Sequence, residues 1–222
     1  MINAVVAKHR LMDALKKASM FEPGRKYLGM SGIHGCPLRL YRELLHGRYG
    51  QVGERSTLRS LRGNLYEQVT ILRLTEAGIY QPASKREVIA DFDSRFRGHT
   101  DGQTVEGDLV EIKSTNHEDF GRIIESRKPM PAHFAQCQMY MRFGTFQHGL
   151  LVYVSTETYE HYVLDVYPAS RIQEELIAKA HAILDAVDGG PQPQCTCGRC
   201  FESRPIARTA EEVKDEPVAD RS

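Results

Sequence analysis

Two acids and a lysine stand close together in the stretch RGHTDGQTVEGDLVEIKST, which runs from Arg97 to Thr115. Alternate residues of a β-strand point to one face, so Glu111 and Lys113 project together. Asp101 ends the preceding predicted strand, and the intervening residues suffice for a hairpin that sets it beside Glu111. Adjacent carboxylates suit Mg²⁺ or Mn²⁺, and a nearby lysine can stabilise a phosphoryl transition state. This combination is typical of metal-assisted phosphodiester hydrolysis, although a Glu/Lys pair alone is more often an exposed strand face.

The cysteines indicate a second metal site. Cys195, Cys197 and Cys200 crowd into CTCGRC, and Cys36 lies towards the other end of the chain in GCPLRLYRE. Four thiolates match a Cys₄ metal site, and their softness admits both zinc and iron–sulfur clusters. A zinc ribbon with two pairs of cysteines fits this spacing poorly. Such a site would join distant segments as a structural staple. The fifth cysteine, Cys137, is most simply a small buried residue.

Hydrophobic periodicity predicts an α/β fold. Helical spacing indicates helices over residues 3–19, 31–45, 56–78, 116–126, 130–144 and 169–190. Asn116 is the expected N-cap of the fourth of these helices, and Pro131 lies in the first turn of the fifth. Alternating segments indicate strands over 86–92, 94–100, 105–115, 148–156 and 160–167. Strand runs interrupted by helices predict a mixed central sheet flanked by helices.

Four short motifs give the sequence a resemblance to a known superfamily. In chain order they are RGNLYE (Arg62–Glu67), GHTD (Gly98–Asp101), EIK (Glu111–Lys113) and QCQMY (Gln136–Tyr140). Motifs of this kind, in this order, are those of the PD-(D/E)xK nucleases, and the chain more closely resembles their RecB-like exonuclease branch. The resemblance covers about residues 30–155 and implies a restriction-endonuclease-like core.

The resemblance implies a role for each motif residue. The catalytic residues would be Asp101, Glu111, Lys113, Gln136 and Tyr140, and the ligands of Mg²⁺ or Mn²⁺ would be Glu67, Asp101 and Glu111. Gln136 and Tyr140, one helical turn apart, would orient Lys113 or hold a phosphate. Tyr66 stands where many of these enzymes have a metal-binding histidine, which leaves the N-terminal ligand open between Glu67 and His99.

The cysteines resemble those of the iron–sulfur RecB-like nucleases, which include the CRISPR-associated exonucleases and the AddB-type nuclease domains. In these proteins one cysteine precedes the nuclease motifs and three follow them. The resemblance implies a structural [4Fe-4S] cluster, with Zn²⁺ as the alternative, on Cys36, Cys195, Cys197 and Cys200. The C-x-C-x-x-C trio is tighter than the family's usual spacing.

The chain is expected to form one nuclease domain over residues 1–205. Its parts would be a helical annex with Cys36 (1–55), the nuclease core (56–188) and a cysteine-rich cluster segment (189–205). A charged stretch over 206–222 lacks aromatic residues and periodicity, so we expect it to be disordered.

Composition narrows the classes of partner. The 29 Lys and Arg balance 29 Asp and Glu, so DNA must be held by a local patch or a metal rather than by a global basic field. The candidate contacts are Arg39, Arg42, Arg48, Arg62, Lys85 and Arg86, with Tyr41 and Tyr49 among them to stack on bases. A solvated helix face explains these residues equally well. No apolar run approaches the roughly 20 residues of a membrane span, and no signal peptide is evident, so we expect a cytoplasmic protein.

These features together predict a divalent-metal-dependent DNA exonuclease that acts on single strands or ends. DNA repair, recombination and CRISPR adaptation, in a host or a phage, are the processes that such an enzyme would serve, with recombination or CRISPR-adaptation proteins as partners. One alternative is a catalytically silent module that binds nucleic acid or a partner on the same fold. Another is a zinc-stapled restriction-like endonuclease. The sequence does not indicate an oligomeric state.

Overall fold

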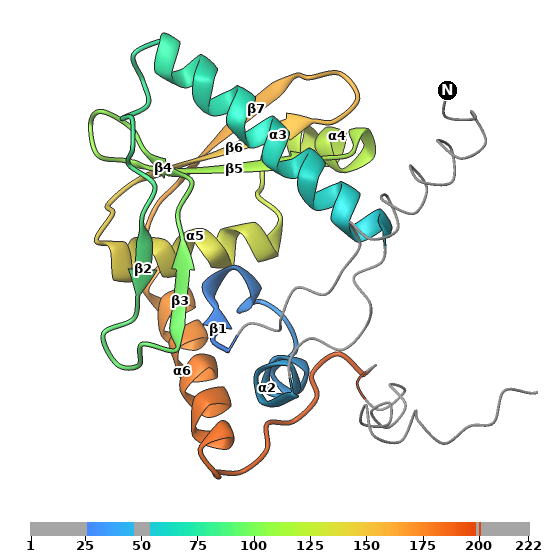
Figure 1. The fold of residues 1–222 in the computed structure, drawn as a ribbon, viewed down its shortest axis with the longest axis vertical. Coiled ribbons are helices and arrows are strands. Elements are labelled where there is room, and N and C mark those ends of the chain that lie inside the picture. The colour runs from blue at the N-terminus through green and yellow to red at the C-terminus, as the bar shows by residue number, and fades with distance from the viewer. Residues whose placement is uncertain (1–25, 47–53, 199, 201–222) are drawn as a thin grey trace, which may run out of the picture.

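The computed structural model describes residues 26–46, 54–198 and 200 of the 222-residue chain (Figure 1). The predicted helix over 3–19, the candidate DNA contacts Arg48 and Tyr49, and the predicted tail over 206–222 lie outside the described residues. Among the helices that are described, none is long and apolar enough to cross a membrane.

A four-stranded mixed sheet lies at the centre of the fold. Its strands are β4 (Gly102–Gln103), β5 (Leu109–Thr115), β6 (Gly149–Ser155) and β7 (His161–Val166), in the spatial order β4-β5-β6-β7. The two central strands run parallel, whereas the outer pairs are antiparallel. β5 and β6 are largely buried along their length. β6 is a near-continuous apolar run, as expected of a buried parallel strand, whereas β5 also carries Glu111 and Lys113. β7 lies at the edge and alternates between exposed and half-buried residues.

A smaller sheet carries the strand that leads into the candidate site. β3 (Phe96–His99) lies between β1 (Leu28–Gly29), which is parallel to it, and β2 (Glu87–Ile89), which is antiparallel. Only Thr100 and Asp101 separate β3 from β4, so the chain passes directly from one sheet into the other (Figure 1). The predicted mixed sheet flanked by helices is confirmed, but its strands are divided between two sheets. The two-residue strands β1 and β4 are too short to show a periodicity.

Helices cover both faces of the four-stranded sheet (Figure 1). α3 (Glu54–Glu76) crosses one face and packs on β5, while α5 (Pro131–Gly144) packs on the other face. α6 (Ser170–Val187) packs against α5 and against α2 (Pro37–His46). A short 3₁₀ turn, η1 (Met30–Gly32), fills the space between β3 and α5. In the helical layer outside α5, the first described α-helix, α2, therefore packs against the last, α6.

Alternate side chains of β5 pack against the two helical layers on opposite faces of the sheet. Val110 belongs to the buried cluster that includes Tyr66 of α3, whereas Leu109 belongs to the cluster that includes Tyr140 of α5. Side chains of a strand alternate between its faces, so Glu111 points to the same side as Leu109. The strand thereby directs an acidic side chain into the layer occupied by α5.

Local sequence signals set the ends of the helices around β5. The Asn116 Oδ1 atom accepts a hydrogen bond from the Asp119 N–H at 2.8 Å, which confirms the predicted N-cap of α4 (His117–Ser126). Pro131 occupies the first position of α5, where its missing N–H removes no helical hydrogen bond. These signals fix where α5 begins and thus which of its residues face β5.

Candidate active site

The hairpin between β4 and β5 places Asp101 beside Glu111. Gly102 pairs with Val110 in antiparallel register, so the preceding residue, Asp101, lies opposite Glu111. The Asp101 Oδ2 atom accepts a hydrogen bond from the Ile112 N–H at 2.7 Å. This bond fixes the carboxylate against β5, in the arrangement that the sequence predicts.

A tyrosine from outside the hairpin holds the backbone at Asp101. The Tyr80 hydroxyl donates a hydrogen bond to the Asp101 carbonyl oxygen at 2.7 Å. Gly102 has a φ of +142° and lies against the Tyr80 ring, so a Cβ atom at this position would overlap the phenol. The glycine after Asp101 is therefore required by both its backbone conformation and its neighbour.

Glu111 is fully buried, and only one of its two oxygens is hydrogen bonded. Its Oε1 accepts from the Lys113 Nζ at 2.5 Å and from the Gln136 Nε2 at 2.6 Å. Its Oε2 has no hydrogen-bond partner among the described residues. A buried carboxylate oxygen carries a large desolvation penalty unless a cation or a water meets it. The side chains present therefore fit a hard divalent cation at this position.

α5 supplies the amide and the phenol that orient Glu111. Gln136 and Tyr140 are one helical turn apart, and the Gln136 Nε2 also donates to the Tyr140 hydroxyl at 3.1 Å. A Cβ atom at Gly98 would lie 2.7 Å from the Tyr140 ring, so the glycine of the GHTD motif provides the space for this tyrosine. Three motifs that are separate in the sequence thus meet in space. The amide of Gln136 links Glu111 to Tyr140, so the QCQMY motif acts on the carboxylate.

Burial and charge act against each other in this cluster. Burial raises the pKa of Glu111 to about 8, although the charge of Lys113 opposes the shift. Burial likewise raises the pKa of Asp101 against the charge of Lys113. Burial alone would lower the pKa of Lys113, but the charges of Glu111 and Asp101 outweigh it, and the pKa rises well above its ordinary value. Lys113 is therefore a permanent cation, whereas Glu111 holds a proton near neutral pH.

Glu67 of α3 borders the same cluster. Its negative charge contributes to the raised pKa of both Asp101 and Glu111. Its carboxylate is paired with the ammonium of Lys85. Burial alone would lower the pKa of Lys85, but the hydrogen bond to Glu67 and the charges of Glu67 and Asp101 together outweigh burial and raise it. The predicted third carboxylate thus lies near the other two, with a lysine beside it.

His99, the other candidate for the N-terminal ligand, lies elsewhere, as does Tyr66 at the position of the expected histidine. Tyr66 is buried, and its hydroxyl donates to the Thr156 carbonyl oxygen at 2.7 Å. His99 has a side chain that is 64% exposed, and its Nε2 lies 3.8 Å from the Glu87 carboxylate. Of the candidates for this ligand, Glu67 is the one that shares the electrostatic environment of Asp101.

A histidine–tyrosine pair near Lys113 was not predicted. The His133 Nδ1 atom lies 3.1 Å from the Tyr153 hydroxyl, which also accepts from the Met130 N–H at 3.0 Å. Burial lowers the pKa of His133 to about 4, and the charge of Lys113 acts in the same direction. His133 is therefore neutral at physiological pH. The pair joins α5 to β6, and no local sequence pattern marks such a contact.

The four predicted cluster cysteines come together at the other end of the molecule. Their sulfur atoms all lie within 4.8 Å of one another, although 159 residues separate Cys36 from Cys195. The Arg42 guanidinium of α2 donates to the Cys200 carbonyl oxygen at 3.0 Å. On the other side, the Lys179 ammonium of α6 lies 3.2 Å from the Ile33 carbonyl oxygen. The cysteine cluster therefore joins the start of α2 to the segment that follows α6.

The spacing of the sulfur atoms bears on which centre the cysteines can hold. Four of the six Sγ–Sγ distances are 3.4, 3.5, 3.6 and 3.9 Å. One zinc ion with Zn–S bonds of about 2.3 Å places its sulfurs about 3.8 Å apart at the corners of a tetrahedron. In a [4Fe-4S] cubane each thiolate binds a different iron, so the sulfurs lie roughly 6 Å apart. The donor set suits either centre, and the spacing is that of a single ion.

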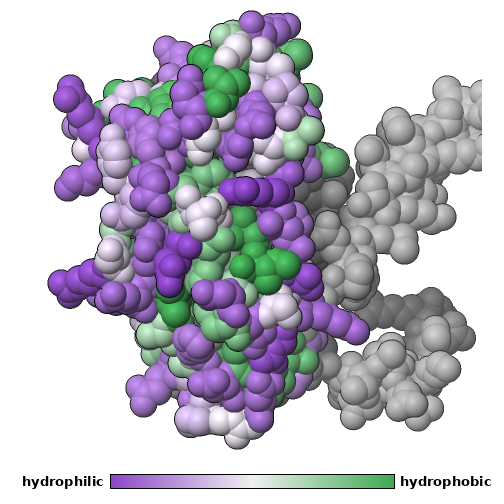
Figure 2. Space-filling model, turned by 90° about the vertical axis from the view of Figure 1, so that its left-hand side faces the viewer, coloured by the Kyte–Doolittle hydropathy of each residue, from purple (hydrophilic) through white to green (hydrophobic). Residues whose placement is uncertain are grey.

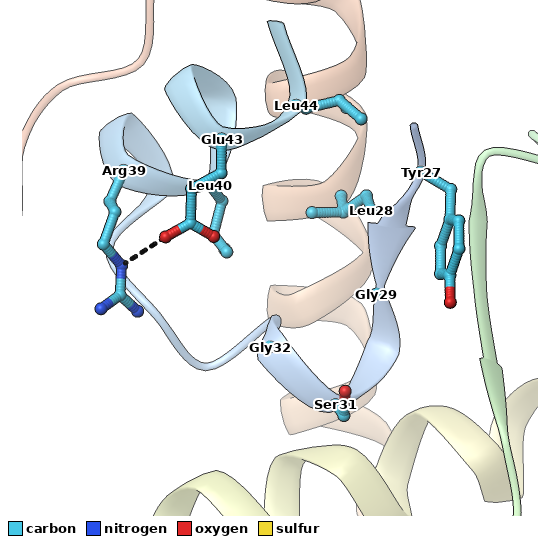
Figure 3. Close-up of a pocket in the computed structure, with 9 residues that line it drawn as sticks. All are labelled: Tyr27, Leu28, Gly29, Ser31, Gly32, Arg39, Leu40, Glu43 and Leu44. Atoms are coloured by element: carbon cyan, nitrogen blue, oxygen red, sulfur yellow. Dashed lines mark ion pairs between the residues drawn. The ribbon is translucent and has the colours of Figure 1, made fainter. Parts of the chain in front are cut away.

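The residues predicted to contact DNA differ in their burial and in their partners. Arg39 forms an ion pair with Glu43 at 3.7 Å and lines a hollow of about 260 Å³ beside α2, where Tyr27 also lies (Figure 3). Arg42 contacts Cys200, and Tyr41 is half-buried against the core. Arg62 is exposed on α3, and Lys85 and Arg86 are exposed on the loop before β2.

The side of the molecule that carries β2 and β4 is mostly hydrophilic, with hydrophobic side chains in small patches (Figure 2). Scattered apolar side chains are normal on a folded surface, so this side gives no independent evidence for a partner.

No protein-family model matches the sequence, and no curated protein matches it closely. Solved structures, by contrast, share its fold. LHK-Exo, an alkaline exonuclease from Laribacter hongkongensis, matches with a TM-score of 0.58 at 16% identity, over 80% of this chain and 93% of that chain. Its complex with dAMP matches with a TM-score of 0.59 at 16% identity, over 74% of this chain and 89% of that chain.

A phage-related exonuclease from Haemophilus somnus 129PT also matches, with a TM-score of 0.50 at 11% identity, over 73% of this chain and 94% of that chain. Likeness at such identities concerns the fold and not the reaction. It confirms the restriction-endonuclease-like α/β core that the sequence motifs predict. This chain has the fold of the alkaline exonucleases, together with a four-cysteine cluster.

Proposed function

We propose that this protein is a divalent-metal-dependent DNA exonuclease. The observation that carries the proposal is the buried Glu111, whose Oε1 is held by Lys113 and Gln136 while its Oε2 has no partner among the described residues. Asp101 lies directly opposite on the neighbouring strand. An open carboxylate oxygen, a second carboxylate and a fixed lysine form a suitable group for phosphodiester hydrolysis.

Each residue then has a part in the reaction. Asp101 and Glu111 would hold Mg²⁺ or Mn²⁺, with Glu67 as the further ligand. A divalent ion held by these carboxylates would supply an activated water and neutralise charge on the phosphate. Lys113, a permanent cation, stabilises the negative charge that develops on the phosphoryl oxygens. Gln136 and Tyr140 act as positioning residues, because their hydrogen bonds determine which way the Glu111 carboxylate faces.

DNA as the substrate is supported by two kinds of likeness. The motif order resembles that of RecB-like exonucleases, and the fold is shared with an alkaline exonuclease whose structure is known with dAMP. Action on single strands or ends, in repair, recombination or CRISPR adaptation of a host or a phage, follows from the sequence resemblance. Recombination or CRISPR-adaptation proteins would then be its partners.

The test is digestion of end-labelled linear DNA, single- and double-stranded, with Mg²⁺ or Mn²⁺ and with a chelator. We expect nucleotides to be released from ends, whereas a circular substrate should survive. Asp101→Asn and Lys113→Ala should abolish cleavage while the thermal melt shows that they still fold. Asp108→Asn is the matched control, because this acid of the same hairpin pairs with His148 at 3.3 Å instead. Metal-independent or undiminished cleavage by Asp101→Asn would refute the assignment.

Cleavage of the circle would favour the restriction-like endonuclease, and binding without cleavage would favour the silent module. The silent module is disfavoured because every residue of the predicted catalytic set is present, and Glu111, Lys113, Gln136 and Tyr140 are joined by hydrogen bonds.

The four cysteines would hold a structural metal centre with no part in cleavage. The sequence resemblance favours a [4Fe-4S] cluster, whereas the observed sulfur spacing favours a single Zn²⁺ ion. Protein purified without oxygen distinguishes them. A cluster gives broad visible absorbance with iron and sulfide, and zinc gives a colourless protein with one metal ion per chain.

A further inference from the structure

Lys85 has an unusual position for a lysine on a loop. Its side chain is 44% exposed, yet its ammonium is paired with the Glu67 carboxylate at the edge of the acidic cluster. Its positive charge also acts on Asp101. The sequence suggested only that this residue belongs to a basic DNA track, and the structure places it within reach of two of the three proposed metal ligands.

The backbone on both sides of Lys85 is tied to the chain around Asp101. The Ser84 Oγ atom accepts from the Gln103 N–H at 3.0 Å. On the other side, the Arg86 carbonyl oxygen accepts from the Thr100 N–H at 3.0 Å. Arg86 is further held by a hydrogen bond from its guanidinium to the Gly144 carbonyl oxygen at 2.7 Å. The loop therefore holds the Lys85 backbone firmly beside the carboxylates, while its long side chain can turn.

The charges of the cluster explain why a lysine is held there. Three carboxylates, those of Glu67, Asp101 and Glu111, gather around two ammonium groups. Lys113 is enclosed, with a side chain 23% exposed, and is bonded to Glu111. Lys85 is the more exposed of the two lysines and bonds to the most peripheral carboxylate. A divalent cation that binds in this cluster therefore meets the enclosed ammonium of Lys113, which cannot move away, and the exposed ammonium of Lys85, which can.

We propose that Lys85 is the resident cation of the metal-free acidic site, and that a divalent cation must displace its ammonium from Glu67 in order to bind. This inference rests on the proposed metal site. Lys85 in this role is a positioning residue that acts through Glu67. It keeps the carboxylates compatible with the fold when the metal is absent, and it lowers the affinity of the site for metal by competing for the same oxygen.

The competition has a predictable size. The displaced ammonium still repels the doubly charged ion, and at a separation of about 6 Å in water this repulsion changes the affinity about tenfold. Loss of the exposed ion pair with Glu67 adds little to this opposition. Removing the ammonium should therefore tighten binding of a divalent cation about tenfold. The same removal should destabilise the metal-free protein, since it leaves repulsion among the carboxylates uncompensated.

The experiment titrates purified, metal-free full-length protein with Ca²⁺ by calorimetry and follows its thermal melt. Ca²⁺ is a hard ion that binds carboxylate oxygens. Lys85→Met and Lys85→Gln should each bind Ca²⁺ about tenfold more tightly than the wild type, and each should melt at a lower temperature without metal. Lys85→Arg keeps the charge and should behave like the wild type. Arg171→Met is the control for net charge, because this guanidinium is 90% exposed on α6.

Binding of Ca²⁺ by both neutral variants with unchanged or weaker affinity would overturn the proposal, as would equal tightening in Arg171→Met. Failure of the wild type itself to bind Ca²⁺ or Mg²⁺ would instead overturn the metal site, and with it the proposed function. The two failures are therefore distinguishable, and neither readout depends on cleavage activity.

Discussion

Metal binding at the acidic cluster should depend on pH through Glu111. Its pKa is raised to about 8, chiefly by burial and against the charge of Lys113. A protonated Glu111 must lose its proton before its open Oε2 can bind a cation as a carboxylate oxygen. About one carboxyl in ten is ionised at pH 7 and about nine in ten at pH 9. The apparent affinity for Ca²⁺ should therefore rise about tenfold between these pH values, which is about 1.4 kcal/mol.

The stability of the metal-free protein should change in the opposite direction. The pKa of Glu111 in the folded protein lies above the ordinary value of 4.5, so the folded state binds more protons between these two values. The contribution of Glu111 to the free energy of unfolding is therefore present below about pH 4.5 and is lost as the pH rises towards about 8. Glu111→Gln cannot ionise, so the free energy of unfolding of this variant should lack this dependence on pH.

Calorimetric titration with Ca²⁺ at the two pH values measures the affinity, and urea denaturation without metal measures the stability. Proton release on binding, obtained from titrations in buffers of different ionisation enthalpy, should be close to one at pH 7 and small at pH 9. Equal affinities at the two pH values, with no proton released at pH 7, would refute the reasoning.

Three further perturbations test other parts of the structure. Gln136→Leu removes a hydrogen-bond donor from the buried Glu111 and should lower the free energy of unfolding by about 1–3 kcal/mol. It should also lower the rate of DNA cleavage. An unchanged urea midpoint and an unchanged cleavage rate would contradict this. Tyr159 has a left-handed φ of +62°, so Tyr159→Gly should be more stable than Tyr159→Ala by about 1 kcal/mol in the same assay, and a difference of zero would argue against strain. Cys36→Ser should lower the melting temperature of the metal-loaded protein markedly and expose the segment after residue 190 to protease, since metal binding contributes to folding; a melt like that of the wild type would show that no metal holds this segment.

The sequence could predict that the proposed site residues lie together, because their placement depends on local patterns. The period of two in EIK places Glu111 and Lys113 on one face of β5, and the hairpin brings Asp101 opposite. The period of 3.6 places Gln136 and Tyr140 on one face of α5. These relations need only the geometry of a strand, a turn and a helix. Sequence reasoning can therefore recover them without knowing how the elements pack.

The parts that sequence reasoning did not supply depend on packing between distant segments. Lys85 meets Glu67 across 18 residues and a change of element, so no local period relates them. The pairing of His133 with Tyr153 joins a helix to a strand in the same way. The hydrogen bond from Tyr66 to the Thr156 carbonyl oxygen likewise depends on how α3 packs on the sheet. A pattern with a period of 2 or 3.6 contains no information on such rotations.

The cysteine cluster has a consequence for the order of events during synthesis of the protein. Cys36 leaves the ribosome early, and its first partner, Cys195, follows 159 residues later. At ordinary rates of translation this delay is on the order of 10 to 30 seconds. During that time Cys36 has been made but the other three cysteines have not, while the intervening strands and helices emerge. A metal centre could therefore be enclosed by all four thiolates only after the proposed catalytic residues have been made. Loss of the last cysteines by early termination would leave the four sequence motifs complete but the centre unassembled.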